Sequence, residues 1–170
     1  MLYVSNSGSV TVTATNCRLH NNTATIFQFG TGNHTLNLFG SAIFGNNITT
    51  NGGVAYFASG DTSGNQTIIA TNTLFYDNKA NNLTSNDNIS GRVTGSGSVF
   101  YLESTGAGQY VELLNCTFLN NVAAWNATVC MISSNSKGQT INITQSEIHN
   151  NSARISGAFL SYQAFNTSTQ

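Results

Sequence analysis

Few side chains in this sequence could carry acid–base chemistry, because only 6% of the 170 residues are charged. Hydrolysis by paired carboxylates needs two convergent acids, and elimination needs a carboxylate-bound cation beside a base. Asp77 and Lys79 flank Asn78, and Asp87 precedes Arg92 in a long polar stretch. No two acids recur at matching positions of adjacent repeats. We therefore expect no enzymatic activity, with Asp87 and Arg92 as the least unfavourable catalytic pair.

The histidines and cysteines do not form a metal-ligand pattern. His20 and His149 occupy matching positions in the first and last of five repeats, and His34 is isolated in a turn. Cys17 and Cys116 fall three repeats apart, about 14 Å at the spacing of strands, whereas a disulfide requires Cα atoms within roughly 7 Å. We interpret both, and Cys130 on a different strand, as small buried side chains. No metal and no cofactor are expected.

The overall charge and the apolar segments exclude two classes of partner. The formal net charge is −1, so no basic face is available for nucleic acid. No apolar run approaches the ~18–20 residues of a membrane helix, and no signal peptide is visible in residues 1–6.

A repeated asparagine is the most regular polar feature of the chain. In five segments a small residue is followed two positions later by an apolar one and five positions later by Asn, as in Cys116-Thr117-Phe118-Leu119-Asn120-Asn121. We interpret the recurring side chains as a structural ladder of hydrogen-bonded amides at a turn. Its predicted members are Asn22, Asn47, Asn78, Asn121 and Asn151.

Alternating apolar residues before and after each asparagine indicate short strands with one buried face. Val111 and Leu113 precede Asn121, and Cys130 and Ile132 follow it, each pair spaced by two. No sustained helical period occurs. Three short strands per repeat predict an all-β fold, a right-handed parallel β-helix (solenoid) of about five coils, as one domain over residues 1–170. In the second repeat, Leu38 to Ala42 is one residue longer than elsewhere, and Gly40 is the expected bulge.

The sequence resembles the repeats of polymorphic outer-membrane proteins. The resemblance lies in Phe-x-x-Asn at 44–47, 75–78 and 118–121, and in Gly52-Gly53-Val54-Ala55 and Ser156-Gly157-Ala158-Phe159. It implies a right-handed parallel β-helix of the pectin-lyase-like superfamily, often part of a surface adhesin. Many folds of that superfamily are polysaccharide lyases or hydrolases, which is the alternative function.

An outward apolar face is predicted on the last strand of each repeat. If Ala55 and Phe57 face the interior, strand alternation turns their neighbours outward. This contact wall would bind another subunit or a carbohydrate, unless a loop such as 81–97 covers it. Its predicted members are Val54, Tyr56, Val99, Tyr101, Met131 and Phe159.

Sequons suggest an extracellular or cell-surface location. Asn-x-Ser/Thr is about twice as frequent as composition alone predicts, and attached glycans would supply the solubility that charge does not. Candidate N-glycosylation sites are Asn21, Asn33, Asn65, Asn82, Asn88, Asn126, Asn150 and Asn166.

Residues 1–8 and 164–170 are short and polar and are not expected to cap a coil. We therefore expect either an excerpt of a longer solenoid or copies that associate end to end or laterally. The expected function is a non-catalytic structural or adhesive β-helix, such as a stalk, adhesin segment or filament subunit. A carbohydrate-binding module is a further alternative.

Overall fold

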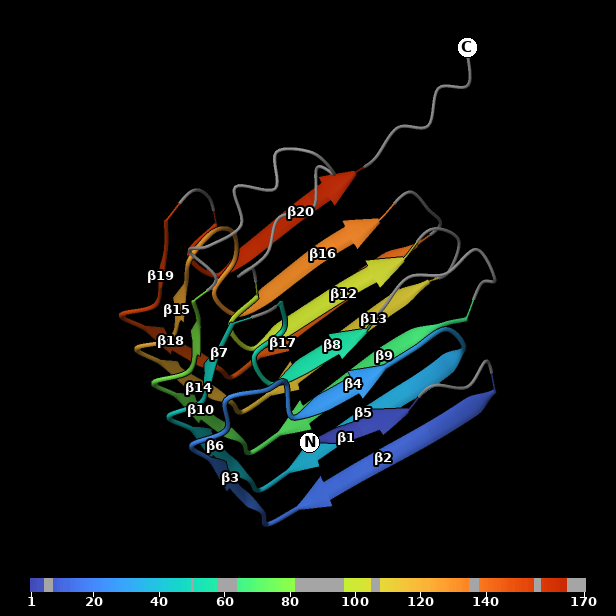
Figure 1. The fold of residues 1–170 in the computed structure, drawn as a ribbon, viewed down its shortest axis with the longest axis horizontal. Coiled ribbons are helices and arrows are strands. Elements are labelled where there is room, and N and C mark those ends of the chain that lie inside the picture. Colours follow the sequence, from blue (N-terminus) through green and yellow to red (C-terminus); the bar gives the residue numbers. More distant parts are fainter. Residues whose placement is uncertain are drawn as a thin grey trace.

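Extended strands account for all the regular structure that the computed structural model describes, which covers residues 1–4, 8–49, 51–57, 64–81, 97–104, 108–134, 138–154 and 157–164. No helix occurs among these residues, and every strand pair is parallel (Figure 1). The all-β prediction is confirmed at this level.

The strands belong to four sheets, which we name A to D. Sheet A contains β1 (Leu2–Val4), β4 (Phe27–Phe29), β8 (Ala55–Phe57), β12 (Phe100–Ser104), β16 (Cys130–Ser134) and β20 (Leu160–Ala164). Sheet B contains β2 (Ser9–Thr15), β5 (Asn33–Phe39), β9 (Gln66–Thr71), β13 (Gln109–Leu114) and β17 (Gln139–Thr144). Sheet C contains β3 (Arg18–His20), β6 (Ala42–Phe44), β10 (Leu74–Tyr76), β14 (Thr117–Leu119) and β18 (Glu147–His149). Sheet D contains β7 (Asn47–Ile48), β11 (Lys79–Ala80), β15 (Val122–Ala123) and β19 (Ser152–Ala153).

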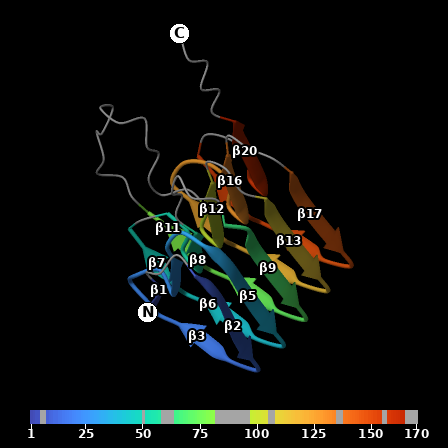
Figure 2. The ribbon, with the colours of Figure 1, turned by 90° about the vertical axis from the view of Figure 1, so that its right-hand side faces the viewer.

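The chain visits the sheets in the order B, C, D, A and then returns to B, so neighbours within a sheet come from successive repeats (Figure 2). We number the repeats 1 to 5 by their strand in sheet B. Sheet D corrects the prediction of three strands per repeat, because a fourth strand follows the asparagine in repeats 2 to 5. Its strands have two residues each, too few to leave an alternating pattern in the sequence.

Residues 1–8 were expected to contribute only a polar terminus, but β1 pairs with β4, with Tyr3 beside Gln28. Sheet A therefore has six strands.

Like residues lie above one another in the core because the parallel pairing keeps the repeats in register. Phe75 and Phe118 are neighbours on β10 and β14, and their rings stack with centroids 4.8 Å apart and planes within 2°. Phe29 and Phe57 stack in the same way on sheet A, at 4.5 Å. All four side chains are fully buried. Burial of each contributes on the order of 1.5–3 kcal/mol.

Repeat 2 is displaced by one residue from the predicted register. Ile43, not Phe44, pairs with Leu19 and Phe75 and is fully buried. Ser41, not Ala42, takes the position of Thr73: it is buried, and its amide lies 3.5 Å from the threonine hydroxyl. The Phe-x-x-Asn motif at 44–47 therefore does not mark the core. Counted to Ser41 instead of Ala42, the interval from Leu38 is as long as in the other repeats.

Gly40 is a regular turn residue rather than a bulge. It has φ +56°, and the residues at the same turn in the other repeats also lie in the left-handed region, with φ between 51° and 53°. Asn is the non-glycine residue that best tolerates this conformation. The turn column contains Asn16, Gly40, Asn72, Asn115 and Gln145.

Candidate functional site

The asparagine ladder exists, with Asn46 in place of the predicted Asn47. The Nδ2 of each member donates to the Oδ1 of the next, at 2.8, 2.8, 3.0 and 2.9 Å from repeat 1 to repeat 5. Asn47 is exposed on β7, and its Oδ1 accepts a hydrogen bond from Asn81 instead. The ladder members are Asn22, Asn46, Asn78, Asn121 and Asn151.

The buried amides of the ladder are fully used by the protein. Asn78 Oδ1 accepts from both the backbone N–H and the Nδ2 of Asn46, at 3.4 and 2.8 Å. Its Nδ2 donates to the Ile43 carbonyl at 2.9 Å and to Asn121 Oδ1 at 3.0 Å. Asn46, Asn78 and Asn121 have 0% exposure. A side chain with no exposed or unused atom has nothing left to bind a ligand, so the ladder is structural.

A second ladder of small polar side chains follows sheet B. The Ser41 hydroxyl lies within hydrogen-bonding distance of the carbonyls of Ala14 and Phe39, and Thr73 repeats the arrangement with Leu38 and Thr71. Cys116 takes the same position, with Sγ 3.3 Å from the Ala70 carbonyl. Burial raises the pKa of the Cys116 thiol, so this sulfur is a structural group rather than a nucleophile.

The predicted contact wall is wrong in its central members. Val54 and Val99 have 0% exposure and belong to the main hydrophobic core. They precede β8 and β12, in bends where strand alternation does not apply. The amides of Val54 and Ala55 both donate to the Val99 carbonyl, at 2.9 and 3.0 Å. Consecutive residues can therefore both face the interior.

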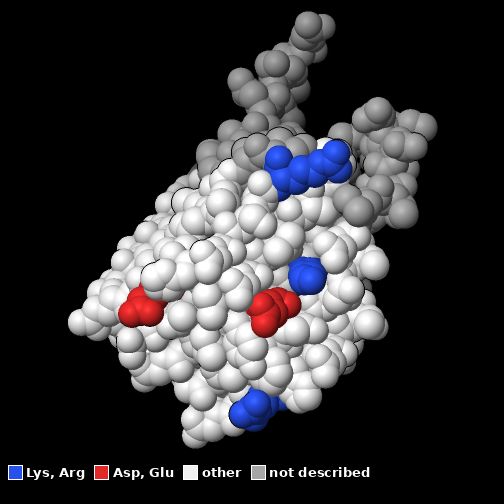
Figure 3. All heavy atoms as spheres, turned by 90° about the vertical axis from the view of Figure 1, so that its left-hand side faces the viewer, with Lys and Arg blue, Asp and Glu red and all other residues white. Residues whose placement is uncertain are grey.

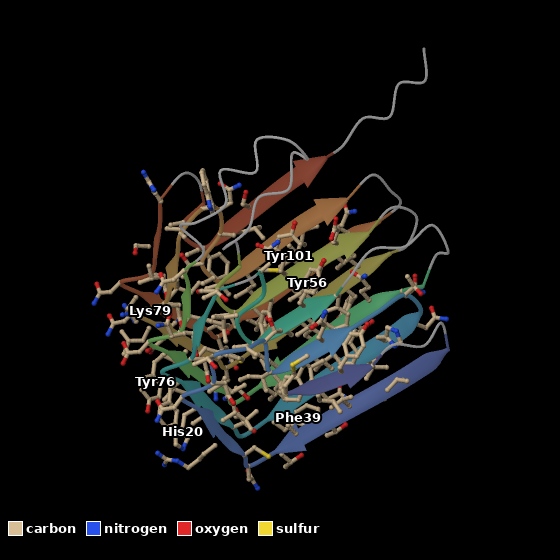
Figure 4. The ribbon with its side chains drawn as sticks, viewed as in Figure 1. His20, Phe39, Tyr56, Tyr76, Lys79 and Tyr101 are labelled. Carbon is tan, nitrogen blue, oxygen red and sulfur yellow. The ribbon has the colours of Figure 1, made fainter. Side chains whose placement is uncertain are left out.

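The tyrosines of the predicted wall do face outward from sheet A, but protein covers them. Tyr101 is 7% exposed and forms a small cluster with Tyr56 and the fully buried Ala127 (Figure 4). The Tyr56 hydroxyl donates to Glu103 Oε2 at 2.9 Å, and the two tyrosine rings are 5.5 Å apart. Phe159 is half-buried against the main core, and the side chain of Met131 lies outside the described part of the structure. Exposure thus falls along the described part of the outward column of sheet A, from Tyr3 at 57% through the half-buried Tyr56 to Tyr101.

An aromatic column that the sequence analysis missed lies on the outer face of sheet C. His20, Phe44 and Tyr76 follow one another on β3, β6 and β10. Their rings stack at 4.8 and 4.6 Å with planes 10° and 6° apart. Figure 4 shows His20 and Tyr76 on this side of the molecule, well apart from Tyr56 and Tyr101. The Phe-x-x-Asn motif hid this column, because it aligns Phe44 with the buried Phe75 and Phe118.

A polar pocket of about 440 Å³ lies over β13 and β17. Its lining includes Glu112 and Asn142, and both contact the neighbouring Tyr110. The Tyr110 hydroxyl donates to Glu112 Oε2 at 2.5 Å, and Asn142 Nδ2 lies 3.3 Å from the same hydroxyl. The bond to Glu112 raises the pKa of Tyr110, because ionisation of the phenol would lose it.

Three of the four described carboxylates stand on different sheets, and the fourth, Asp77, is exposed in the turn between β10 and β11. Glu103 contacts Tyr56 on sheet A, Glu112 contacts Tyr110 on sheet B, and Glu147 lies 3.6 Å from His149 on sheet C. Asp87 and Arg92, the least unfavourable catalytic pair of the sequence, lie outside the described residues, as does Asp61. Within the described ranges, no group of three His, Cys, Asp or Glu side chains could hold a metal ion.

The three histidines have separate environments. His20 stacks on Phe44, and His149 approaches Glu147. His34 is fully buried, with Nε2 3.1 Å from the Thr31 carbonyl and its ring against Phe29. The expectation of an isolated turn histidine is therefore corrected: His34 is an inward residue of β5, above which Gln66 lies on β9. The three cysteines are free thiols, Cys17 half-buried and the others buried.

The candidate sequons that the structure describes are mostly exposed. Asn21 and Asn150 are exposed turn residues with φ 57° and 51°. Asn33 and Asn65 are exposed, although their Oδ1 atoms accept backbone N–H bonds from Asn65 and Gly108. Asn126 is half-buried. Asn82, Asn88 and Asn166 lie outside the described residues.

Comparison with known proteins gives no relative: no family model, no curated protein and no solved structure matches this chain. Among the described residues, no helix has the length and apolar character needed to cross a membrane.

Proposed function

We propose that this chain is a right-handed parallel β-helix that serves as a non-catalytic structural or adhesive module outside the cell or on its surface. A stalk, an adhesin segment and a filament subunit all fit this role. One observation carries the proposal: a hydrogen-bonded ladder of one asparagine from each of five repeats runs through the buried interior. The most regularly repeated residues of the chain thus connect its repeats.

The order of the sheets supports the helical winding. Each strand of sheet B pairs with its counterparts in the neighbouring repeats, and sheets C, D and A follow the same order. A chain that passes four sheets in turn and then returns one strand higher advances by about 4.8 Å per repeat. Columns of matching side chains follow directly from this advance, as in other repeat architectures.

The placement of charge supports a role without catalysis. Glu103, Glu112 and Glu147 lie on three different sheets, so no two of them converge on one substrate. Figure 3 shows only a few charged side chains on the face that it draws. The buried thiols of Cys116 and Cys130 are poor nucleophiles, because burial raises the pKa of both.

Electron microscopy of the purified chain, paired with polysaccharide incubation, tests the proposal. We expect filaments, and aligned material should give a diffraction reflection at about 4.8 Å along the filament axis. Incubation with polysaccharide should release no reducing or unsaturated sugar ends. Aligned material without a reflection near 4.8 Å along its axis would overturn the β-helix. Turnover of any polysaccharide would overturn the non-catalytic role.

Carbohydrate binding at the Glu112 pocket is a second candidate, favoured by the pocket's polar lining and by the adjoining Tyr110. Hydroxyl groups of a sugar can be bound by a carboxylate and an amide, while an aromatic side chain packs on its apolar face. Titration with neutral oligosaccharides, followed by NMR of the Asn142 side-chain amide, tests this candidate. A shift that Glu112→Gln abolishes would support it, and unchanged spectra at millimolar sugar would exclude it.

A further inference from the structure

The outer face of sheet C carries a row of half-buried apolar side chains. It consists of two columns that run across all five repeats. The first column is Arg18, Ala42, Leu74, Thr117 and Glu147. The second is His20, Phe44, Tyr76, Leu119 and His149. The six residues of the three middle repeats are half-buried, and the four residues of the first and last repeats are exposed. The face is thus apolar in the middle and polar at both ends.

The stacking of the rings limits what this face can bind. Phe44 and Tyr76 are stacked at 4.6 Å with planes 6° apart, so each ring covers its neighbour and presents only its edge to solvent. A sugar packs against the face of an aromatic ring, and these ring faces are occupied. A flat row of ring edges beside Ala42 and Leu74 suits another flat apolar protein surface instead.

The charges make this face complementary to itself. Arg18 and Glu147 stand in the same column, at opposite ends of sheet C. Leu74 and Tyr76 occupy its centre, on β10. A twofold rotation about an axis parallel to the strands and above β10 exchanges repeat 1 with repeat 5. This rotation brings Arg18 of one copy opposite Glu147 of the other, twice.

We propose that the outer face of sheet C is a homodimer interface, in which two copies pack face to face about this twofold axis with antiparallel stacking directions. Phe44 of one copy meets Leu119 of the other, and Leu74 and Tyr76 meet their own counterparts at the axis. Arg18 is already held on the face, with its guanidinium carbon 5.3 Å from the Phe44 ring centroid. This contact orients the charge toward its partner at little further entropic cost.

The size of the face sets the strength of the association. Five strands spaced by ~4.8 Å and three residues wide give a flat area on the order of 250 Å² per copy. Interfaces well below roughly 1,200 Å² in total form weak, transient complexes. The dimer therefore forms where copies are concentrated, as in an array or a bundle of filaments. The inference deepens the proposed structural role and rests on it, because it names the lateral partner that such a module would use.

Sedimentation equilibrium of the full chain at ~10 μM to ~1 mM tests the proposal. Protein without N-glycans is used, because Asn21 follows His20 directly at the border of the face. We expect concentration-dependent dimers whose association constant falls with added salt. Arg18→Glu and Glu147→Arg should each weaken dimerisation about tenfold, since each places two like-charged pairs across the interface. The double variant Arg18→Glu/Glu147→Arg should restore the wild-type constant.

Two further variants separate the interface from general effects. Arg154→Glu makes the same change of charge at an exposed residue after β19, outside the face, and should leave dimerisation unchanged. Leu74→Arg places two arginines at the axis and should abolish dimers without rescue by the charge swap. A monomer at 1 mM, or a double variant no better than the single ones, would overturn the interface. That result together with an absence of polysaccharide turnover would leave the proposed structural role intact.

Discussion

Asn46 donates its side-chain amide to Asn78 Oδ1 at 2.8 Å, although Asn47 is the residue that the Phe-x-x-Asn motif selects. The difference of one residue decides which side chains of repeat 2 are buried. It places Ile43 in the core and releases Phe44 to the outer face of sheet C, beside His20 and Tyr76. The register of repeat 2 thus determines both the buried ladder member and the side chains of the surface that we assign to dimerisation.

Asn78→Ala should destabilise the fold by about 3–5 kcal/mol. The substitution leaves the backbone N–H of Asn46 and one N–H of its side-chain amide buried without a partner, and each such group costs roughly 1–3 kcal/mol. Urea unfolding followed by circular dichroism measures the change in the free energy of unfolding. Asn47→Ala is the matched control and should change it by less than about 0.5 kcal/mol, because Asn47 is exposed. Equal effects of the two substitutions would contradict the ladder assignment.

Tyr101→Ala should destabilise the protein by about 2–4 kcal/mol, because it removes a side chain that is 7% exposed and packs on Tyr56 and Ala127. Tyr3 provides the control, since the outward column Tyr3, Gln28, Tyr56 and Tyr101 runs across sheet A. Tyr3 is 57% exposed, and Tyr3→Ala should cost under about 0.5 kcal/mol. Thermal unfolding of both variants distinguishes a covered tyrosine from an open contact wall, for which the two losses would be similarly small.

Alanine substitutions at three glycines distinguish the cost of backbone strain from the cost of a steric clash. Gly138 has φ +64° with open space around a Cβ, so Gly138→Ala should cost only about 1–2 kcal/mol of left-handed strain. A Cβ on Gly53 would lie 2.2 Å from the Ser98 carbonyl oxygen without that strain. Gly97 combines φ +63° with a Cβ 2.2 Å from the Phe100 carbonyl oxygen. We therefore expect Gly97→Ala to exceed Gly138→Ala in loss of unfolding free energy. The reverse order in urea titrations would contradict the close packing of turns on sheet A.

Alkaline pH should destabilise the fold through Cys130. Burial raises the pKa of the Cys130 thiol from 9.0 to about 12. Below pH 9 both states hold the proton, and this contribution to stability is complete. Between pH 9 and 12 only the unfolded state loses the proton, so the free energy of unfolding falls by about 1.4 kcal/mol per pH unit. Cys130→Ala should show a shallower slope by that amount in urea titrations at pH 8 to 11. Parallel slopes would show that the thiol is accessible.

Much of the fold follows from local patterns in the sequence. Strand alternation identified the inward residues of sheets A and B, such as Ala55 with Phe57 and Val111 with Leu113, and these lie buried as expected. The recurrence of Asn identified a ladder and four of its five members. Both signals are set by nearest-neighbour geometry, which a single sequence contains.

The features that the sequence analysis missed depend on contacts between distant segments, which local patterns do not contain. Asn46 and Asn47 are adjacent and chemically identical, so only pairing with β3 and β10 decides between them. Val54 breaks the alternation because its amide shares the Val99 carbonyl with Ala55, a contact between residues of different repeats. The cover over Tyr101 comes from Ala127, 26 residues further along the chain. Each error arose where a distant segment overrides a local rule.

All four side-chain bonds of the asparagine ladder point in the same direction, from donors in repeat 1 toward acceptors in repeat 5. Their dipoles therefore add, and each bond polarises the next, so the central rungs gain most. Amide hydrogens near Asn78 should exchange last, and opening should progress rung by rung from the periphery. A force applied along the stacking axis should therefore break the ladder bonds one after another.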